Sequence, residues 1–179
     1  MNAWTCSPWT DAGQLMALID PDEEPGAAAG QALPEWYAQL LDRGELDTAI
    51  EFLCHALPRY ECLVWATRAL LEIRAVERSD PLIVAVLRWI DDPDDAKRRA
   101  AAQAGETVKK MNAAQLLCEA TFLSGGSMAP EHLPAVQPPP DACAKLASGA
   151  ILLGAYALDD PVAAKRKALA LGEAIVTRQ

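Results

Sequence analysis

The spacing of hydrophobic residues along the chain predicts helices and shows no convincing strand alternation. In residues 58–77 the apolar positions recur every three or four residues, which gathers them on one helical face. Residues 93–123 follow the same rule, so one long helix is predicted there, with Gly105 as a point where it can bend. Residues 81–90 are apolar on nearly all sides, and we expect them to form the most buried helix.

Helix starts are marked by aspartate followed by proline, because aspartate caps free backbone N–H groups and proline lacks one. The pairs Asp80-Pro81, Asp92-Pro93 and Asp160-Pro161 are read this way, and Thr10 is the expected cap of the first helix. Short turns between helices favour antiparallel neighbours. The predicted class is therefore all-α, with about eight helices in a compact bundle of antiparallel helical hairpins: 11–19, 34–43, 46–56, 58–77, 81–90, 93–123, 142–158 and 161–177.

A twelve-residue stretch occurs twice, as DDPDDAKRRAAA at 91–102 and DDPVAAKRKALA at 159–170. We interpret it as a shared way of starting a helix and not as a binding element. In the first copy, Asp94 with Arg98 and Asp95 with Arg99 are predicted to form ion pairs four residues apart. The second copy lacks these acids. Its cations therefore predict a solvated face, an ion pair with another part of the chain, or a site for an acidic ligand or partner: Lys165, Arg166 and Lys167.

Two segments interrupt the helices. Residues 20–33 are a surface linker, so the chain divides into residues 1–44, packed on or near the bundle, and a helical domain at 45–179. The segment 124–140, SGGSMAPEHLPAVQPPP, is rich in proline and glycine and is unusually long for a connection in a compact domain. We interpret it as a strap packed on the bundle through Met128, Leu133 and Val136, with a partner-binding loop as the alternative and disorder as a third.

Composition narrows the classes of protein that fit. With 179 residues, 51% of them hydrophobic, the chain can bury a core, and no apolar run is long enough to cross a bilayer. The net charge of −9 argues against nucleic acid as a partner. Five scattered cysteines and the lack of a secretory signal indicate a reducing, cytoplasmic location.

No motif predicts catalysis, a metal site or a cofactor. The Gly125-Gly126 pair follows a helix and lacks the lysine of a phosphate-binding loop. Cys54 and His55 are adjacent on a helix and diverge by about 100°, so they cannot form one edge of a metal site. An enzyme with a site assembled from His55, Glu61 and Arg68 is kept as an alternative.

The five tryptophans raise the question of a partner surface. Trp65 and Trp89 lie within apolar helices and are expected in the core, whereas Trp36-Tyr37 either packs on the bundle or anchors a partner. Trp4 and Trp9 either fasten the N-terminus to the core or dock on another chain.

Three stretches together resemble an uncharacterised family of bacterial α-helical proteins over residues 45–175: FLCHALPR at 52–59, WIDDPDDAKRRAAAQAGE at 89–106, and LSGGSMAPEHLPAVQPPPD at 123–141 with the ASGAILLGAYA that follows. The resemblance implies no established activity, and it implies an association with type VI secretion gene clusters.

The function predicted from these features is a non-enzymatic adaptor or chaperone that binds a protein of a bacterial secretion or effector system. An immunity protein that binds a basic toxin is the alternative, and homo-oligomerisation is a further one. The candidate partner-binding residues are Trp36, Tyr37, Pro58, Arg59, Ser124, Gly125, Gly126, Ser127, Met128, Pro130, Leu133, Lys165 and Arg166.

Overall fold

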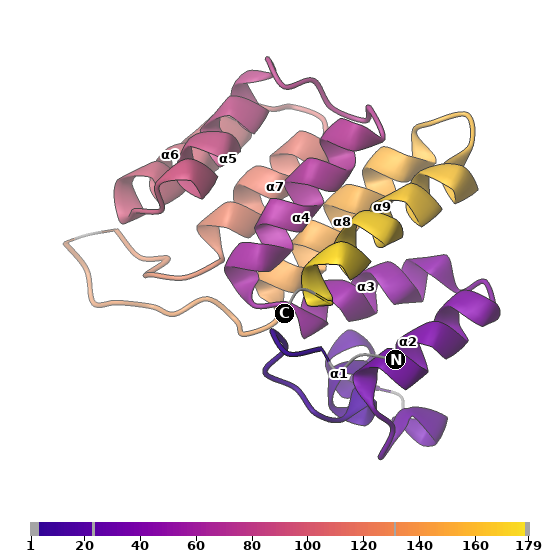
Figure 1. Ribbon diagram of the computed structural model, residues 1–179. Helices are drawn as coiled ribbons and strands as arrows, with labels where there is room; N and C mark the ends of the chain where they lie inside the picture. Colours follow the sequence, from indigo (N-terminus) through magenta and orange to yellow (C-terminus); the bar gives the residue numbers. More distant parts are fainter. Residues whose placement is uncertain (1–3, 23, 131, 178–179) are drawn as a thin grey trace.

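The computed structural model describes residues 4–22, 24–130 and 132–177, and this part of the chain is entirely helical apart from its connections. The all-α prediction is therefore confirmed. Figure 1 shows the helices packed side by side, with a long loop projecting between α7 and α8. The helices are α1 (Ala12–Ile19), α2 (Leu33–Asp42), α3 (Leu46–Ala56), α4 (Arg59–Glu72), α5 (Pro81–Asp91), α6 (Asp95–Glu106), α7 (Ala113–Phe122), α8 (Ala142–Tyr156) and α9 (Pro161–Val176), with a 3₁₀ turn, η1, at Gly26–Ala28.

The segment predicted as one helix over 93–123 is two helices, α6 and α7, so that prediction was wrong. The chain leaves the helix after Glu106, and Asn112 begins the next one by accepting from the backbone N–H of Gln115 at 2.9 Å. The two helices contact each other along their lengths. A Cβ atom on Gly105 would lie 3.2 Å from the Cβ of Cys118, so the glycine allows this close approach.

Aspartate caps occur as expected, but two of them lie at other positions. Asp80 and Asp160 cap α5 and α9 as predicted. In the first copy of the repeat the cap is Asp94 and not Asp92, so the helix starts two residues later than Pro93 indicates. Asp11, not Thr10, caps α1 by accepting from the N–H of Gly13 at 2.7 Å.

The predicted helix over 58–77 is also shorter than expected. It ends at Glu72, and Arg74 adopts a left-handed φ of 63°, which a regular helix does not allow.

The core runs through α8, which contacts α3, α4, α7 and α9. Trp65 of α4 is completely buried and donates from Nε1 to the carbonyl of Ala168 in α9 at 2.8 Å, while Trp89 is 7% exposed, so both core predictions are confirmed. The most buried helix is not α5: α3 buries eight of its eleven residues and α5 four of eleven. α5 flanks the bundle beside α6, so one of its faces meets solvent (Figure 1).

The helices of the N-terminal quarter pack on the rest of the bundle. Both α1 and α2 contact α3, and Leu15 and Leu40 belong to the same core cluster as the later helices. The cysteines at 6, 54, 62, 118 and 143 are free thiols, and all but Cys6 are buried.

Candidate functional site

The loop between α7 and α8, residues 124–140, is held at both ends by one arginine. Arg59 lies at the first position of α4, where its guanidinium donates from Nη1 to the carbonyl of Ser124 and from Nη2 to the carbonyl of Pro140, both at 3.2 Å. These two carbonyls belong to the first and last residues of the loop. Arg59 therefore fixes the loop's base on the start of α4, where FLCHALPR ends.

Two arginines of α6 hold the first part of the loop, residues 124–129, where the chain leaves α7. Arg98 is buried, donates to the carbonyl of Phe122 and, at 2.8 Å, to the carbonyl of Ser127, and stacks on the Phe122 ring at 4.6 Å. Arg99 reaches the carbonyl of Ser127 at 3.1 Å and that of Ala129 at 3.0 Å. Together these contacts satisfy backbone acceptors that have no helix or sheet to pair with.

The acidic residues that orient these arginines differ in part from the predicted pairs. Asp95 does pair with Arg99, at 2.7 Å, but it also binds Arg98 at 2.6 Å, whereas Asp94 caps the helix and pairs with Lys97. The predicted pair between Asp94 and Arg98 was wrong. Hydrogen bonds from Arg99 and Arg98 lower the pKa of Asp95, so it stays ionised at neutral pH.

The loop crosses Arg98 at Gly126, and both its backbone conformation and its surroundings favour glycine there. Its φ is +63°, and a Cβ atom there would lie 2.9 Å from Nη2 of Arg98 and 3.0 Å from Oδ1 of Asp95. A side chain here would strain the backbone, and the side chains of Arg98 and Asp95 would have to shift to make room for it. Neither glycine of the Gly125-Gly126 pair lies at the start of a helix.

The loop turns back on itself beyond this point. The N–H of Met128 donates to the carbonyl of Val136 at 2.8 Å, and Ser127 Oγ accepts from the N–H groups of Ala129 at 3.1 Å and Val136 at 3.0 Å. These bonds close the neck of a small hairpin, where residues 127–129 lie against Val136.

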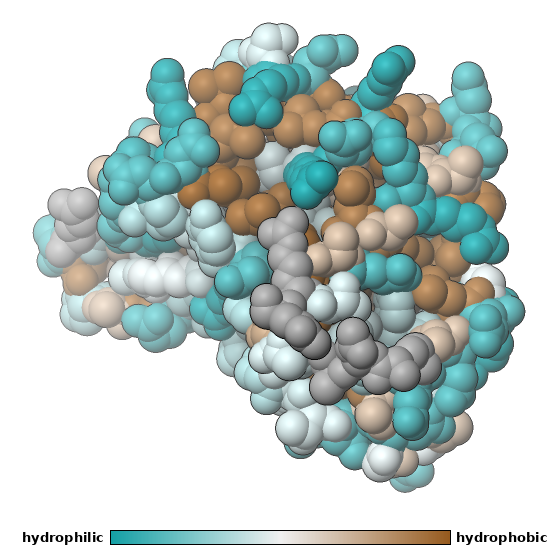
Figure 2. Space-filling model, viewed as in Figure 1, coloured by the Kyte–Doolittle hydropathy of each residue, from teal (hydrophilic) through white to brown (hydrophobic). Residues whose placement is uncertain are grey.

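The tip of the loop faces solvent, which corrects the packed-strap interpretation. Leu133 is 51% exposed and Val136 50% exposed, although both were expected as anchors. Met128 is half-buried, and Pro138 is the buried residue near the return to α8. In Figure 2 hydrophobic atoms surface at the left edge of the view, where Figure 1 places the tip. The loop is thus packed at its base and presents apolar side chains at its end.

A cleft of about 430 Å³ lies between this loop and the helices α6 and α7. Phe122, Met128 and Pro130 supply apolar surface, and Glu106 and Glu119 supply carboxylates, with Arg99 and Gln103 among the other lining residues. This cleft could not be predicted from local sequence patterns, because its walls come from α6, from α7 and from the loop.

The loop and the helices that hold it belong to a region shared with a known protein family. The model of a family of unknown function, DUF6931, matches residues 36–176. The chain belongs to this family. The matched region starts inside α2, contains the whole loop with its three arginines, and ends at the last residue of α9. Membership of an uncharacterised family, expected from the resemblance, is confirmed. No curated protein and no solved structure matches the chain.

Several residues predicted as partner contacts lie inside the DUF6931 fold. Trp36 and Tyr37 are 7% and 4% exposed, because they face the core from α2. Lys165 is buried as well, bonded through Nζ to Asp47 at 2.6 Å, so its charge has an internal partner. These three side chains do not offer a free surface, whereas Arg166 is exposed on α9, far along the chain from the loop.

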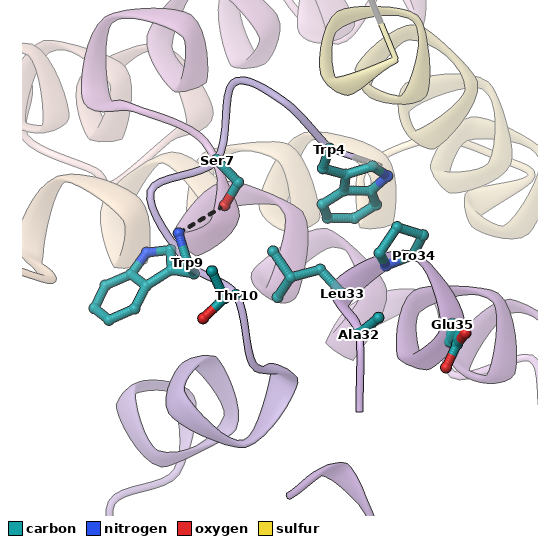
Figure 3. Close-up of a pocket in the computed structure, with 8 residues that line it drawn as sticks. All are labelled: Trp4, Ser7, Trp9, Thr10, Ala32, Leu33, Pro34 and Glu35. Atoms are coloured by element: carbon teal, nitrogen blue, oxygen red, sulfur yellow. Dashed lines mark hydrogen bonds between the residues drawn. The ribbon is translucent and has the colours of Figure 1, made fainter. Parts of the chain in front are cut away.

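The N-terminal tryptophans are fastened to the core. The Trp4 ring lies edge-on to Tyr37 at 5.2 Å between ring centroids, and Trp9 donates from Nε1 to the carbonyl of His55 at 3.1 Å. They lie on either side of Leu33 in a cleft of about 410 Å³ (Figure 3). Of the two alternatives for this terminus, the structure shows the intramolecular one.

The three residues kept for a scattered enzyme site do not line one cavity. His55 lines a cavity at the turn between α3 and α4, and neither Glu61 nor Arg68 belongs to its wall. Arg68 is exposed on α4. Within residues 4–22, 24–130 and 132–177, no group of three or more histidine, cysteine, aspartate or glutamate side chains is placed to hold a metal ion. In the same residues no helix combines the length and the hydrophobicity that a membrane span needs.

Proposed function

We propose that the protein is a non-enzymatic accessory, an adaptor or chaperone, that binds another protein through the loop 124–140. The observation that carries this proposal is the pair of exposed apolar side chains, Leu133 and Val136, on a loop that three arginines hold in place. The exposed parts of these two side chains contribute no burial energy to the fold itself. A partner bound at the loop would bury them.

The arrangement favours binding on energetic grounds. Burying one side chain of this size contributes roughly 1.5–3 kcal/mol. A loop that is already ordered loses less conformational entropy on binding than a free one. Arg59, Arg98 and Arg99 supply that order through bonds to loop carbonyls, and they leave the tip uncovered.

The adjoining cleft suggests the chemistry of the partner. Phe122 and Met128 offer apolar contact, while Glu106 and Glu119 place two carboxylates in the same wall. A partner segment that combines apolar residues with lysine or arginine fits both features.

The test is site-specific photocrosslinking in the native cell, with a photoreactive residue at Leu133 and, as the matched control, at Val162. Val162 is 52% exposed on α9, close to the 51% exposure of Leu133, but it is far from the loop. We expect one discrete protein adduct from position 133 and none from position 162. The adduct should disappear in a Val136→Asp background whose circular dichroism is unchanged.

Two results would contradict the proposal. Equal adducts from both positions would mean contact without specificity, and no adduct from position 133 would mean that the loop tip meets no partner. Identification of the crosslinked protein by mass spectrometry then shows whether it carries the apolar and basic segment.

The biological setting stays a prediction. The link to a bacterial secretion or effector system rests on the family resemblance alone. The immunity alternative rests on the net charge of −9, which would complement a basic toxin. Rescue of cells from one co-encoded toxin would favour it over an adaptor.

A further inference from the structure

The turn that joins α6 to α7, residues 107–112, carries cations that the fold leaves unused. Lys109 and Lys110 are exposed, and within the described residues neither forms an ion pair or a side-chain hydrogen bond. Met111 is 67% exposed, the highest value among the large hydrophobic side chains that the structure describes. The turn therefore presents two unpaired positive charges beside an apolar side chain.

The cleft of about 430 Å³ between α6, α7 and the long loop has the complementary chemistry. Glu106 and Glu119 are exposed carboxylates in its wall, and neither forms an ion pair in the part of the chain that the structure describes. Arg99, in the same wall, is engaged by Asp95 at 2.7 Å and by two loop carbonyls. The cleft thus combines two unpaired negative charges with the apolar surface of Phe122.

Within one molecule the turn and the cleft adjoin without meeting. Lys109 follows Glu106 by three residues, yet the structure places no ion pair between these two described residues. The cleft follows α6 from Arg99 to Glu106, which is ~10 Å at the rise of an α-helix, and the turn begins directly beyond it. Figure 1 shows this turn at the end of α6 and α7 that lies away from the loop 124–140.

Adjoining patches of opposite charge suit a two-fold contact, in which each copy offers the same surface to the other. A two-fold axis at the boundary between cleft and turn lays the turn of each copy over the cleft of the other. We propose that the cleft receives the 107–112 turn of a second copy of this chain. The two lysines of the turn then face Glu106 and Glu119, and Met111 lies against Phe122. Every contact occurs twice, once in each cleft.

This dimer uses the cleft that the proposed function assigns to a partner, so a partner segment has to displace the turn before it binds there. That regulatory consequence rests on the proposed function, whereas the dimer rests only on the charges and exposures of the chain. The two proposals fail separately. Self-association of the purified protein tests the dimer, and an adduct to a different protein in cells tests the partner.

Sedimentation velocity of the full-length protein tests the dimer. Contacts made largely by exposed charges lie at the weak end of protein interfaces, so we expect a monomer–dimer equilibrium with a Kd of ~10–100 µM. Raising the salt concentration from ~0.05 M to ~0.5 M should weaken the dimer at least ~5-fold, because exposed ion pairs are screened.

Two charge reversals identify the surfaces. Lys109→Glu with Lys110→Glu makes the turn acidic, and Glu106→Lys with Glu119→Lys makes the cleft basic. Each reversed protein alone should dimerise at least ~10-fold more weakly than the wild type, because like charges then meet in both contacts. An equimolar mixture of the two should form a heterodimer of wild-type strength, since both contacts again join opposite charges.

The matched control is Arg68→Glu with Arg88→Glu, which changes the net charge by the same amount as the turn reversal. Both arginines are exposed, on α4 and α5, and neither is ion-paired among the residues that the structure describes. The control should dimerise within ~3-fold of the wild type. Met111→Ser keeps every charge and should weaken the dimer at least ~5-fold through the loss of apolar burial.

Three results would overturn the inference. The first is a wild type that stays monomeric at ~500 µM, the second is a turn reversal that dimerises as tightly as the control, and the third is a mixture of the two reversed proteins that remains monomeric. Circular dichroism establishes that each variant is folded. If one reversed protein does not fold, Met111→Ser and the salt dependence decide.

Discussion

Replacing Arg98 by methionine should release the loop 124–140 from α6. The change keeps an apolar stem and removes every guanidinium bond. The carbonyl of Phe122 loses a charged donor, which costs about 1.5–3 kcal/mol. The carbonyl of Ser127 keeps Arg99 at 3.1 Å, so its loss is smaller. Asp95 is half exposed, so the ion pair with it adds at most ~1 kcal/mol. Together these contributions predict a loss of roughly 2–4 kcal/mol in the free energy of unfolding.

The assay has two parts, because a structural loss and a loop release need different measurements. Urea unfolding gives the change in free energy, and the matched control is Arg166→Met on the exposed face of α9, expected to stay within ~0.5 kcal/mol of wild type. Hydrogen exchange of the Met128 and Val136 amides reports on the loop, since both are bonded within its hairpin. We expect faster exchange there in Arg98→Met and unchanged exchange in the core of α8.

The reasoning would be refuted by an Arg98→Met protein as stable as the control with unchanged exchange at both loop amides. Stability lost without faster loop exchange would mean that Arg98 supports the helix pair and not the loop.

The other predictions concern the core, a buried histidine, and the ion pair between buried Lys165 and the partly exposed Asp47. Gly172→Ala should cost about 1–3 kcal/mol in unfolding experiments, because its Cβ would lie 2.7 Å from an indole carbon of α4, whereas Gly149→Ala, whose Cβ would lie 3.7 Å from its nearest neighbour, should be neutral or stabilising. Burial lowers the pKa of His55, so the unfolded chain binds the proton more readily and stability should fall as pH drops below about 6.5; thermal melts of His55→Gln should show a flatter profile. Burial opposes ionisation of Asp47, yet the hydrogen bonds from Lys165 and from a neighbouring tyrosine leave the pKa of Asp47 lowered. The stability that the ionised carboxylate contributes is therefore present above about pH 4 and lost below it. In urea titrations, Asp47→Asn should lower the stability at pH 7 and remove this loss of stability at acid pH.

The helical class could be predicted because its signals are local. Periodicity and caps each act within a few residues, and Asp80 and Asp160 serve as caps as their sequence context indicates. The limit of such signals is visible in the repeat, where the same DDP start gives a helix from Pro161 in one copy and from Asp95 in the other. Several aspartates in a row offer several caps, and packing of α6 on α7 and on the loop selects one.

The candidate site was predicted in part. The sequence marked the loop and the start of α4 as places for a partner, and the structure joins them through Arg59. It gave no sign that Arg98 and Arg99 bind loop carbonyls, because their acidic neighbours already explain them locally. Nor did it show that Trp36 faces the core, since an aromatic residue near a helix start can lie on the buried face or on the solvent-exposed face of the helix.

What the sequence by itself determined is the all-α class, most of the helix starts, and the break in regular structure at 124–140. Only the tertiary structure decided which face of each helix is covered, that Leu133 and Val136 remain exposed, and that His55 lies in a cavity wall with an unused acceptor. The physical reason is the distance along the chain between the residues that interact. Helix formation depends on neighbours within about four residues, whereas exposure and hydrogen-bond satisfaction depend on residues that meet only when distant segments pack together.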